Sequence, residues 1–442
     1  MKENINLIGD CIETVYNLID KKSIQLPLET LKDIIDQKTK PDDFEIIKTI
    51  AKGGYGEVYL VKSDKVYAMK RVAKEDILKQ PFTSLFMAEK KLLTESVNSE
   101  WLVSAKMTLQ DNEYLYYLMD YIPGGDFMGL LSKEDTLEEK WVKFYTVEII
   151  CALDELHKLG WIHRDLKPDN ILIGKDGHIK LADFGSSIKM ENKKAKSTFV
   201  VGTPDYISPD ILESSNVENE YSENVDFWTL GVIIYEMLFG VTPFYSNSLV
   251  ETYRKIVDLE YNFPFNISEK IKDLIQKLIQ KKDKRLNIYE IKKHPFFEGV
   301  DWENIKSMVP PYIPEILDEF DTSNFYDTAF EMKTRNFIST PNFIDFVGFS
   351  HDPMLEKAVR KLFLNEKEIK NENVPIIKEN DEVKNNKKLL NEIQAQILET
   401  NQKLQDKQNE YKEIIINILS EKDDLDSIEN ELKIKKNSYK IF

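Results

Sequence analysis

The run H-R-D-L-K-P-D-N at residues 163–170, with the D-F-G that follows it, constrains the fold and chemistry of this chain most strongly. Phosphoryl transfer asks little covalent chemistry of a protein, but it needs held phosphates, neutralised charge and an oriented nucleophile. Asp165 can orient an acceptor hydroxyl and take its proton, while Lys167 compensates charge on the moving phosphoryl group. Asn170 and Asp183 offer the oxygen ligands that a hard cation such as Mg²⁺ prefers. The run predicts metal-assisted phosphoryl transfer.

A glycine-rich stretch lies upstream, between segments 44–50 and 57–61, which read as strands. Its glycines would let backbone N–H groups close over phosphates, although glycine pairs alone usually mark turns. Lys70 follows at the end of a third strand-like segment, 65–70, and Glu89 lies in a helical stretch. A phosphate-gripping lysine held by a helix glutamate favours the same chemistry; without Lys70, Glu89 would read as a solvated helix charge. The loop residues assigned to the nucleotide site are Ile50, Ala51, Lys52, Gly53, Gly54, Tyr55, Gly56 and Val58.

The apolar segment 115–121 predicts another strand, and a turn at Pro123, Gly124 and Gly125 ends it. Backbone groups just past such a strand can hydrogen-bond an adenine edge. We therefore add Asp120, Tyr121 and Ile122 to the nucleotide site.

Two helices are expected around the catalytic run. Residues 138–159 form an amphipathic pattern, with Gly160 as the expected C-cap. Residues 225–240 are apolar almost all round, as in a buried helix, so Asp226 needs a hydrogen-bonding partner, expected in the backbone of the catalytic loop. His163 is expected to serve as a structural hydrogen-bonding residue rather than as a base or metal ligand.

Length and composition set wider limits. The chain has 442 residues, which predicts two or three structural units, and a net charge of −17, which argues against nucleic acid as the main partner. Its only cysteines, Cys11 and Cys151, indicate a reducing compartment. Neither a signal peptide nor a run of eighteen apolar residues is evident. These features predict a cytoplasmic protein without a transmembrane segment.

The ends of the chain differ from its centre. Residues 1–40 show helical periodicity, read either as a helix packed on the next domain or as a self-association surface. Scattered prolines and aromatic residues predict an extended strap in 298–380. Residues 385–436 carry a heptad pattern, read as a coiled coil or as a single solvated helix, because four d positions are polar. The heptad a positions are Leu390, Ile397, Leu404, Tyr411, Ile418, Leu425 and Leu432.

Together, the motifs in residues 44–297 resemble the eukaryotic protein serine/threonine kinases. The resemblance implies an α+β fold of two lobes, a small β-rich lobe over a larger helical one, with ATP and Mg²⁺ in the cleft. It also adds Thr203 to the catalytic set of Asp165, Lys167, Lys70 and Glu89. The form of the catalytic loop implies Ser or Thr as the acceptor.

Finer features are similar to the AGC group of these kinases: M-D-Y-I-P-G-G-D-F at 119–127, G-T-P-D-Y-I-S-P at 202–209 and D-T-S-N-F at 321–325. The likeness implies a C-terminal tail with a hydrophobic motif at 346–350. Phe325 would approach the nucleotide, with Asp126 beside it, and Phe346 and Phe349 would dock beside the Glu89 helix. Asp126, Asp169 and Glu236 match positions that favour basic residues before the acceptor.

Within the group, the chain resembles the Rho-associated and myotonic dystrophy kinases, which have a helical extension before the kinase domain and a coiled coil after the tail. This likeness implies a homodimer, a small GTPase as a partner and cytoskeletal association. The nuclear-Dbf2-related and large-tumour-suppressor kinases, with roles in morphogenesis or the cell cycle, are the alternative. A catalytically inactive kinase fold acting as a coiled-coil scaffold is the alternative from another class.

Three positions depart from the family pattern. Ala51 stands at the first glycine of the loop, and S-P-D replaces A-P-E, so Asp210 must reach Arg285 with one methylene fewer. Phe199 stands where the group has its activation-loop threonine, beside Ser197 and Thr198. The resemblance therefore suggests that dimerisation, more than phosphorylation of this loop, sets the active state.

Overall fold

The computed structural model describes residues 38–53, 56–79, 85–197, 200–213, 220–325, 346 and 349–353. The chain divides into two compact units, Met1–Arg360 and Lys361–Phe442, and all described residues belong to the first. The expected N-terminal helices, residues 326–345, 347–348 and 354–380 of the tail and the heptad segment lie outside the described residues, so these remain predictions.

A five-stranded antiparallel sheet, in the order β1-β2-β3-β5-β4, forms the first lobe. Its strands are rich in β-branched and aromatic residues, which favour a pleated, half-buried surface. A short 3₁₀ turn, η1 (Pro41–Asp43), precedes the sheet. The strands are β1 (Glu45–Gly53), β2 (Gly56–Lys62), β3 (Val66–Ala73), β4 (Ala105–Gln110) and β5 (Tyr114–Asp120).

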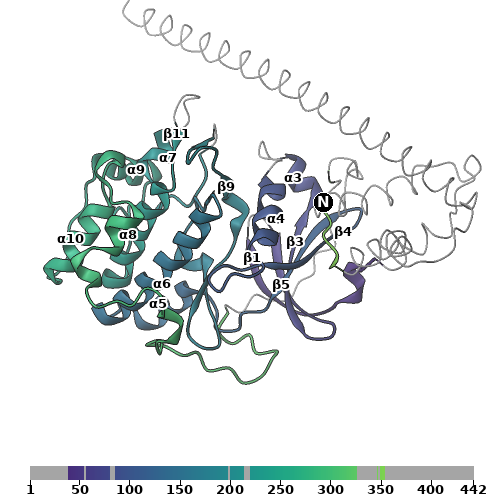
Figure 1. The fold of residues 1–442 in the computed structure, drawn as a ribbon. Helices are drawn as coiled ribbons and strands as arrows, with labels where there is room; N and C mark the ends of the chain where they lie inside the picture. The colour runs from purple at the N-terminus through teal and green to yellow at the C-terminus, as the bar shows by residue number, and fades with distance from the viewer. Residues whose placement is uncertain are drawn as a thin grey trace, which may run out of the picture. The chain divides into compact units, whose positions relative to one another are not determined.

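Two helices accompany this sheet, α3 (Lys74–Lys79) and α4 (Leu85–Glu95). Figure 1 shows both on the same side of the molecule as the sheet, with the larger group of helices across from them. Glu89, Leu92 and Leu93 of α4 are buried. Because Glu89 is buried with two leucines, α4 brings a carboxylate into the interior of the lobe.

The second lobe is mainly helical. Helix α8 is buried from Val225 to Phe239, as its apolar sequence predicts. It contacts both α6 and α10. The helices of this second lobe are α5 (Phe127–Glu134), α6 (Glu139–Lys158), α7 (Pro209–Glu213), α8 (Asn224–Phe239), α9 (Leu249–Asp258), α10 (Glu269–Leu278) and α11 (Ile288–Lys292).

Short strands and turns carry the catalytic motifs between α6 and α8. The strands pair two by two: β6 with β9, β7 with β8, and β10 with β11. The strands are β6 (Trp161–Ile162), β7 (Ile171–Ile173), β8 (Ile179–Leu181), β9 (Ile188–Lys189), β10 (Ala195–Lys196) and β11 (Glu220–Tyr221). The 3₁₀ turns of this lobe and the segment after it are η2 (Pro168–Asn170), η3 (Phe184–Ser186), η4 (Lys282–Lys284), η5 (Pro295–Phe297) and η6 (Ile305–Ser307).

The predicted helix ends need small corrections. Helix α6 has its C-cap at Leu159, and the expected cap, Gly160, is the next residue, with φ +79°. Gly240, expected as the last residue of α8, is its C-cap at φ +71°. Both glycines take a left-handed conformation that a side chain would strain, which is why the helices stop there.

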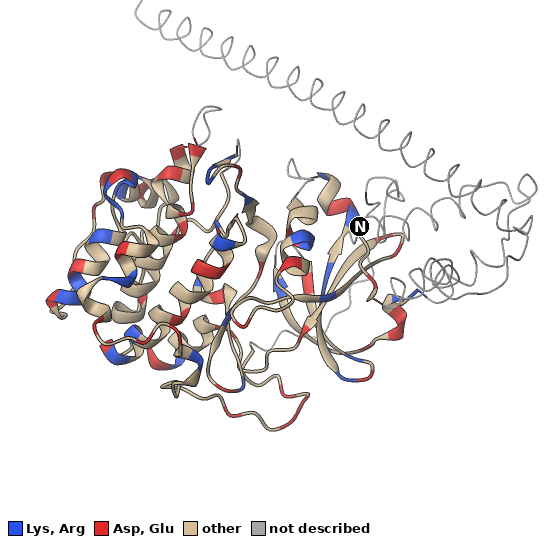
Figure 2. Cartoon of the chain, in the orientation of Figure 1, with Lys and Arg blue, Asp and Glu red and all other residues tan. Residues whose placement is uncertain are grey.

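The surface carries both charges. Figure 2 shows Lys and Arg interspersed with Asp and Glu over the helical lobe. Among the residues that the structure describes, no helix combines the length and apolarity needed to cross a bilayer.

Candidate active site

A cavity of about 330 Å³ contains nearly all of the predicted nucleotide residues. Gly54 and Tyr55 lie outside the described residues. The predicted residues that line the cavity are Ile50, Ala51, Lys52, Gly53, Gly56, Val58, Lys70, Glu89, Asp120, Tyr121, Ile122, Asp126, Lys167, Asn170, Asp183 and Phe325. The structure thus brings together the glycine-rich strands, the strand β5 end and the catalytic loop.

Residues of β1 and β2 line one side of the cavity. Gly56 has φ +142°, and a Cβ there would lie 2.4 Å from the carbonyl oxygen of Arg71, so only glycine fits. Ala51 pairs with Val58 in the β1–β2 ladder. The alanine at the first glycine position is therefore accommodated as a strand residue.

Lys70 joins the two lobes. Its Nζ lies 2.6 Å from Glu89 Oε1 on α4 and 2.8 Å from Asp183 Oδ1 of D-F-G. Burial disfavours the ammonium, but the Asp183 and Glu89 carboxylates raise the pKa of Lys70 above its ordinary value. A charged lysine is thus held at the inner end of the cavity.

The two carboxylates respond differently to this lysine. Burial raises the pKa of Glu89 above its ordinary value, although Lys70 opposes the shift. Burial acts in the same direction on Asp183, but the adjacent Lys70 outweighs it and lowers the pKa of this carboxyl. Asp183 therefore stays ionised across the neutral range.

Asp165, Lys167 and Thr203 form a second cluster. Asp165 Oδ1 accepts hydrogen bonds from the Thr203 backbone N–H at 2.8 Å and from Thr203 Oγ1 at 2.7 Å. Lys167 Nζ donates to Thr203 Oγ1 at 3.0 Å and lies 3.8 Å from Asp165 Oδ2. Asp165 and Thr203 do not line the cavity, but Lys167 does, so the cluster adjoins it.

The predicted metal ligands suit Mg²⁺ by their chemistry. Asn170 Nδ2 donates to the Asp165 carbonyl at 2.7 Å, which leaves the amide oxygen as the atom for a cation. Asp183 offers an ionised carboxylate. No group of three or more His, Cys, Asp or Glu side chains that could hold a metal occurs within the described ranges. Two protein oxygens fit Mg²⁺, which usually takes its other ligands from water and substrate phosphates.

Asp226 holds the backbone of the catalytic loop in place, as the sequence predicted. Asp226 accepts from the backbone N–H groups of His163 at 2.9 Å and Arg164 at 3.0 Å, and it pairs with His157 Nε2 at 2.8 Å. His163 Nε2 lies 3.2 Å from the Ala182 carbonyl. These contacts give His163 a structural position, as predicted.

The segment at 321–325 lies against the end of β5. Phe325 stacks on Tyr121 with ring centroids 5.9 Å apart, and Tyr121 Oη donates to the Asp321 carbonyl at 2.5 Å. Asn324 Nδ2 donates to the Pro123 carbonyl at 3.2 Å. The segment thereby places Phe325 in the cavity wall.

Phe346 and Phe349 lie against α4. Their ring centroids are 5.3 Å and 6.1 Å from that of Phe86, one turn before Glu89. Thr108 Oγ1 donates to the Phe349 carbonyl at 2.6 Å. These two aromatic residues therefore connect α4 with β4.

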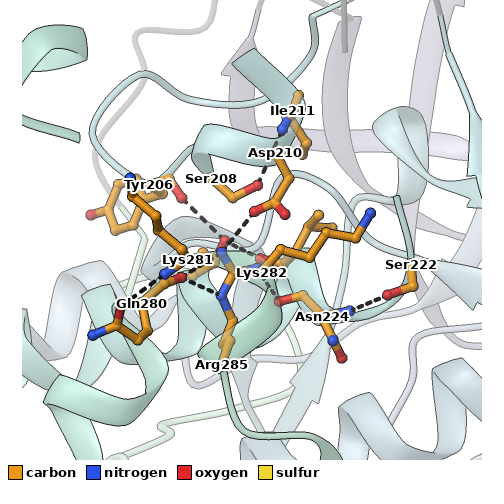
Figure 3. Close-up of polar contacts among 12 residues, drawn as sticks. Tyr206, Ser208, Asp210, Ile211, Ser222, Asn224, Gln280, Lys281, Lys282 and Arg285 are labelled. Carbon is orange, nitrogen blue, oxygen red and sulfur yellow. Dashed lines mark hydrogen bonds and ion pairs between the residues drawn. The ribbon is translucent and has the colours of Figure 1, made fainter. Parts of the chain in front are cut away.

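Asp210 and Arg285 form an ion pair, although aspartate is one methylene shorter than the glutamate of the family pattern. Figure 3 shows the Asp210 carboxylate directed at the guanidinium of Arg285, which also contacts Gln280 and Asn224. The Asp210 Oδ2–Arg285 Nη2 distance is 2.7 Å. Aspartate therefore spans the gap in this chain.

Several acidic side chains near the catalytic loop interact with one another electrostatically. Tyr206 Oη donates to Glu236 Oε2 at 2.7 Å. Burial raises the pKa of Glu236 to about 7, with Asp169 and Asp205 adding to the shift and Tyr206 opposing it. Asp126 caps α5 by accepting from the Gly129 N–H at 2.8 Å. Asp126 therefore has a structural use besides its predicted one.

Sequence reasoning missed the apolar walls of the cavity. These residues carry no chemical motif, and only their places on β3, α4, β5 and β7, just before β4 and just after β8 could have pointed to them. The missed lining residues are Ala68, Leu93, Val103, Met119, Leu172 and Ala182.

Comparison with known proteins agrees with this geometry. Residues 44–297 match the family model "Protein kinase domain". The chain is 45% identical over 331 residues to serine/threonine-protein kinase MRCK alpha of Mus musculus, covering 70% of this chain and 19% of that protein. It is 47% identical over 298 residues to MRCK beta of Homo sapiens, covering 64% and 17%.

A third relative is Rho-associated protein kinase 1 of Oryctolagus cuniculus, 40% identical over 341 residues, with 73% of this chain and 25% of that protein covered. The chain thus spans about a quarter or less of the length of these relatives. The family model matches more than half of the chain, so the chain belongs to the protein kinase family, and its resemblance to the Rho-associated type of serine/threonine kinase is confirmed.

Proposed function

We propose that this protein is a serine/threonine protein kinase that transfers the γ-phosphoryl group of ATP to protein substrates. The observation that carries the proposal is the Asp165 carboxylate, held by Thr203 beside Lys167 at the edge of the nucleotide cavity. Three relatives named as kinases, two of them as serine/threonine-protein kinases, support the choice of acceptor.

In this mechanism Asp165 orients the acceptor hydroxyl and takes its proton as the oxygen–phosphorus bond forms. The bond from the γ-phosphorus to the bridging oxygen breaks, and ADP leaves. Lys70, fixed by Glu89, holds the phosphates of ATP, and Lys167 compensates the charge of the moving group. Asn170 and Asp183 would hold Mg²⁺, which supplies neutralisation of phosphate charge when bound.

The substrate preference follows from the acidic side chains. Asp126, Asp169 and Glu236 would favour substrates with basic residues before the acceptor, because buried or clustered carboxylates gain a counter-ion. The short pairing with Tyr206 holds Glu236 in place for such a contact. We infer peptide segments rich in Lys or Arg as the preferred substrates.

The cellular setting is proposed from the relatives. One of them is named Rho-associated, which suggests a small GTPase as a partner and a cytoplasmic, cytoskeletal place of action. A homodimer through residues 1–40 and 385–436 remains part of this proposal. Light scattering of the full chain tests it, and a monomer at micromolar concentration would contradict it.

The activity is tested with three matched peptides that carry Ser, Thr or Tyr in one basic sequence. We expect phosphate incorporation from ATP into the Ser and Thr peptides, none into the Tyr peptide, and none when EDTA removes Mg²⁺. ATP binding without incorporation into any peptide or into a mixture of proteins would instead identify a nucleotide-binding scaffold.

A further inference from the structure

The Arg164 guanidinium is buried beside the catalytic loop and contacts two other parts of the site. Arg164 is 4% exposed, and its Nε donates to the Ser186 carbonyl at 2.6 Å while its Nη1 donates to Tyr221 Oη at 2.8 Å. Among the residues that the structure describes, no carboxylate forms an ion pair with it. A buried cation is costly unless hydrogen bonds satisfy it, so the two neutral acceptors must hold this charge.

These two acceptors come from separate parts of the site. Ser186 directly follows D-F-G, and Tyr221, itself 2% exposed, lies on β11 and pairs with Ala195 of β10. Strand β10 belongs to the segment between D-F-G and Gly202. Arg164 therefore joins the catalytic loop directly to the D-F-G end of that segment and, through Tyr221, to strand β10 within it.

The backbone of Arg164 is also constrained. Its φ is +68°, a left-handed conformation that costs energy for a residue with a side chain, and its N–H donates to Asp226 Oδ1 at 3.0 Å. Asp165 is the next residue. Any rotation that frees the Arg164 side chain would therefore be transmitted directly to the carboxylate that orients the acceptor.

We propose that Tyr221 is a positioning residue that acts through Arg164 to fix the Asp165 carboxylate for phosphoryl transfer. This inference rests on the proposed kinase function. The neutral hydroxyl of Tyr221 fills the role of an acceptor for the buried guanidinium, which keeps β10–β11 and the catalytic loop in one arrangement.

The test is a double-mutant cycle with Tyr221→Phe and Arg164→Met, assayed for kcat and for KM of ATP in the full chain. A lost hydrogen bond to a charged group predicts a fall in kcat of about tenfold or more for Tyr221→Phe. KM for ATP should change less than about twofold, because Lys70 and Glu89 are untouched. In the Arg164→Met background, Tyr221→Phe should cause little further loss, since the two side chains act as one unit.

Tyr235→Phe is the matched control. Tyr235 is a buried tyrosine of α8 whose hydroxyl donates to the Asn262 carbonyl at 2.8 Å, away from the catalytic loop. The Tyr235→Phe variant should lose thermal stability, as Tyr221→Phe does, but should keep the kcat of the parent. Should Arg164→Met not fold, Arg164→Lys replaces it in the cycle.

If Tyr221→Phe keeps the parent kcat, the inference is overturned. It is also overturned if the two single-variant losses of kcat multiply in the double variant. Either result leaves the proposed function standing. A parent protein that transfers no phosphate at all would overturn the proposed function and this inference with it.

Discussion

Arg285 Nη2 donates to Asp210 Oδ2 at 2.7 Å, and the two side chains are 0% and 7% exposed. Burial lowers the pKa of Arg285 despite the adjacent Asp210. A guanidinium so deeply buried depends on its carboxylate, because the loss of one partner leaves a charge without compensation. This pair fixes α7, which follows Thr203 and Tyr206, against the segment before α11.

Asp210→Ala should therefore destabilise the protein by about 3–5 kcal/mol in urea unfolding. The control is Asp258→Ala, which removes an exposed partner of Arg254 at 2.9 Å and should cost far less, because solvent screens an exposed pair. Equal losses of unfolding free energy in the two variants would show that the buried pair contributes no more to stability than the exposed pair.

The Lys70–Glu89 pair predicts a catalytic effect. Lys70→Met should lower kcat/KM for ATP by about a hundredfold or more, because it removes a preorganised cation from the phosphate site. Glu89→Gln should have a smaller effect in the same direction, since Lys70 keeps Asp183 at 2.8 Å. Lys158→Met, at an exposed position of α6, serves as the control and should match the parent. Parent-like ATP kinetics in Lys70→Met would contradict the assigned role.

Phe349 predicts a link between the tail residues and catalysis. Phe349→Ala should cost about 3–5 kcal/mol, because the fully buried ring leaves a cavity beside Phe86 and Tyr117. It should also lower kcat, since α4 carries Glu89. Leu317→Ala is the control: Leu317 is 77% exposed and should change neither quantity. A stable, fully active Phe349→Ala protein would show that this contact does not support α4.

Glu236 predicts a pH dependence of substrate binding. Its pKa of about 7 means that it is protonated below neutral pH and ionised above it. KM for a peptide with upstream arginine should therefore fall as pH rises from about 6 to 8. The same raised pKa stabilises the folded state fully below about pH 4.5, the ordinary value of the carboxyl, and this contribution is lost as the pH rises from there through about 7.

The comparison uses Glu236→Gln with the same peptide and the parent with an alanine-substituted peptide. In both of these measurements, KM should no longer change between pH 6 and 8. A pH profile that persists in Glu236→Gln would assign the titration to another group.

Much of the cavity could be predicted because the motifs are local in sequence. The spacing of Asp165, Lys167 and Asn170 is fixed by a short loop, so their proximity needs no knowledge of the fold. Lys70 and Glu89 lie on separate segments, so their pairing could be inferred only from the chemistry of phosphate binding, and the structure places Lys70 Nζ 2.6 Å from Glu89 Oε1.

Other contacts could not be read from the sequence. Arg164 and Tyr221 are far apart along the chain, and no periodicity marks a hydroxyl that meets a guanidinium. Strands of two or three residues, such as β10 and β11, are too short to show an alternating pattern. The apolar wall residues Ala68 and Met119 resemble any other core residue until tertiary packing brings them to the cavity.

The central claim is that Asp165 acts in phosphoryl transfer rather than in nucleotide binding. The most direct measurement compares Asp165→Asn with the parent for phosphate incorporation into a Ser peptide and for ATP affinity. The account predicts a loss of rate of about 10²–10⁴-fold with ATP affinity nearly unchanged, since a positioned base contributes about that much. Residual activity close to the parent would contradict it.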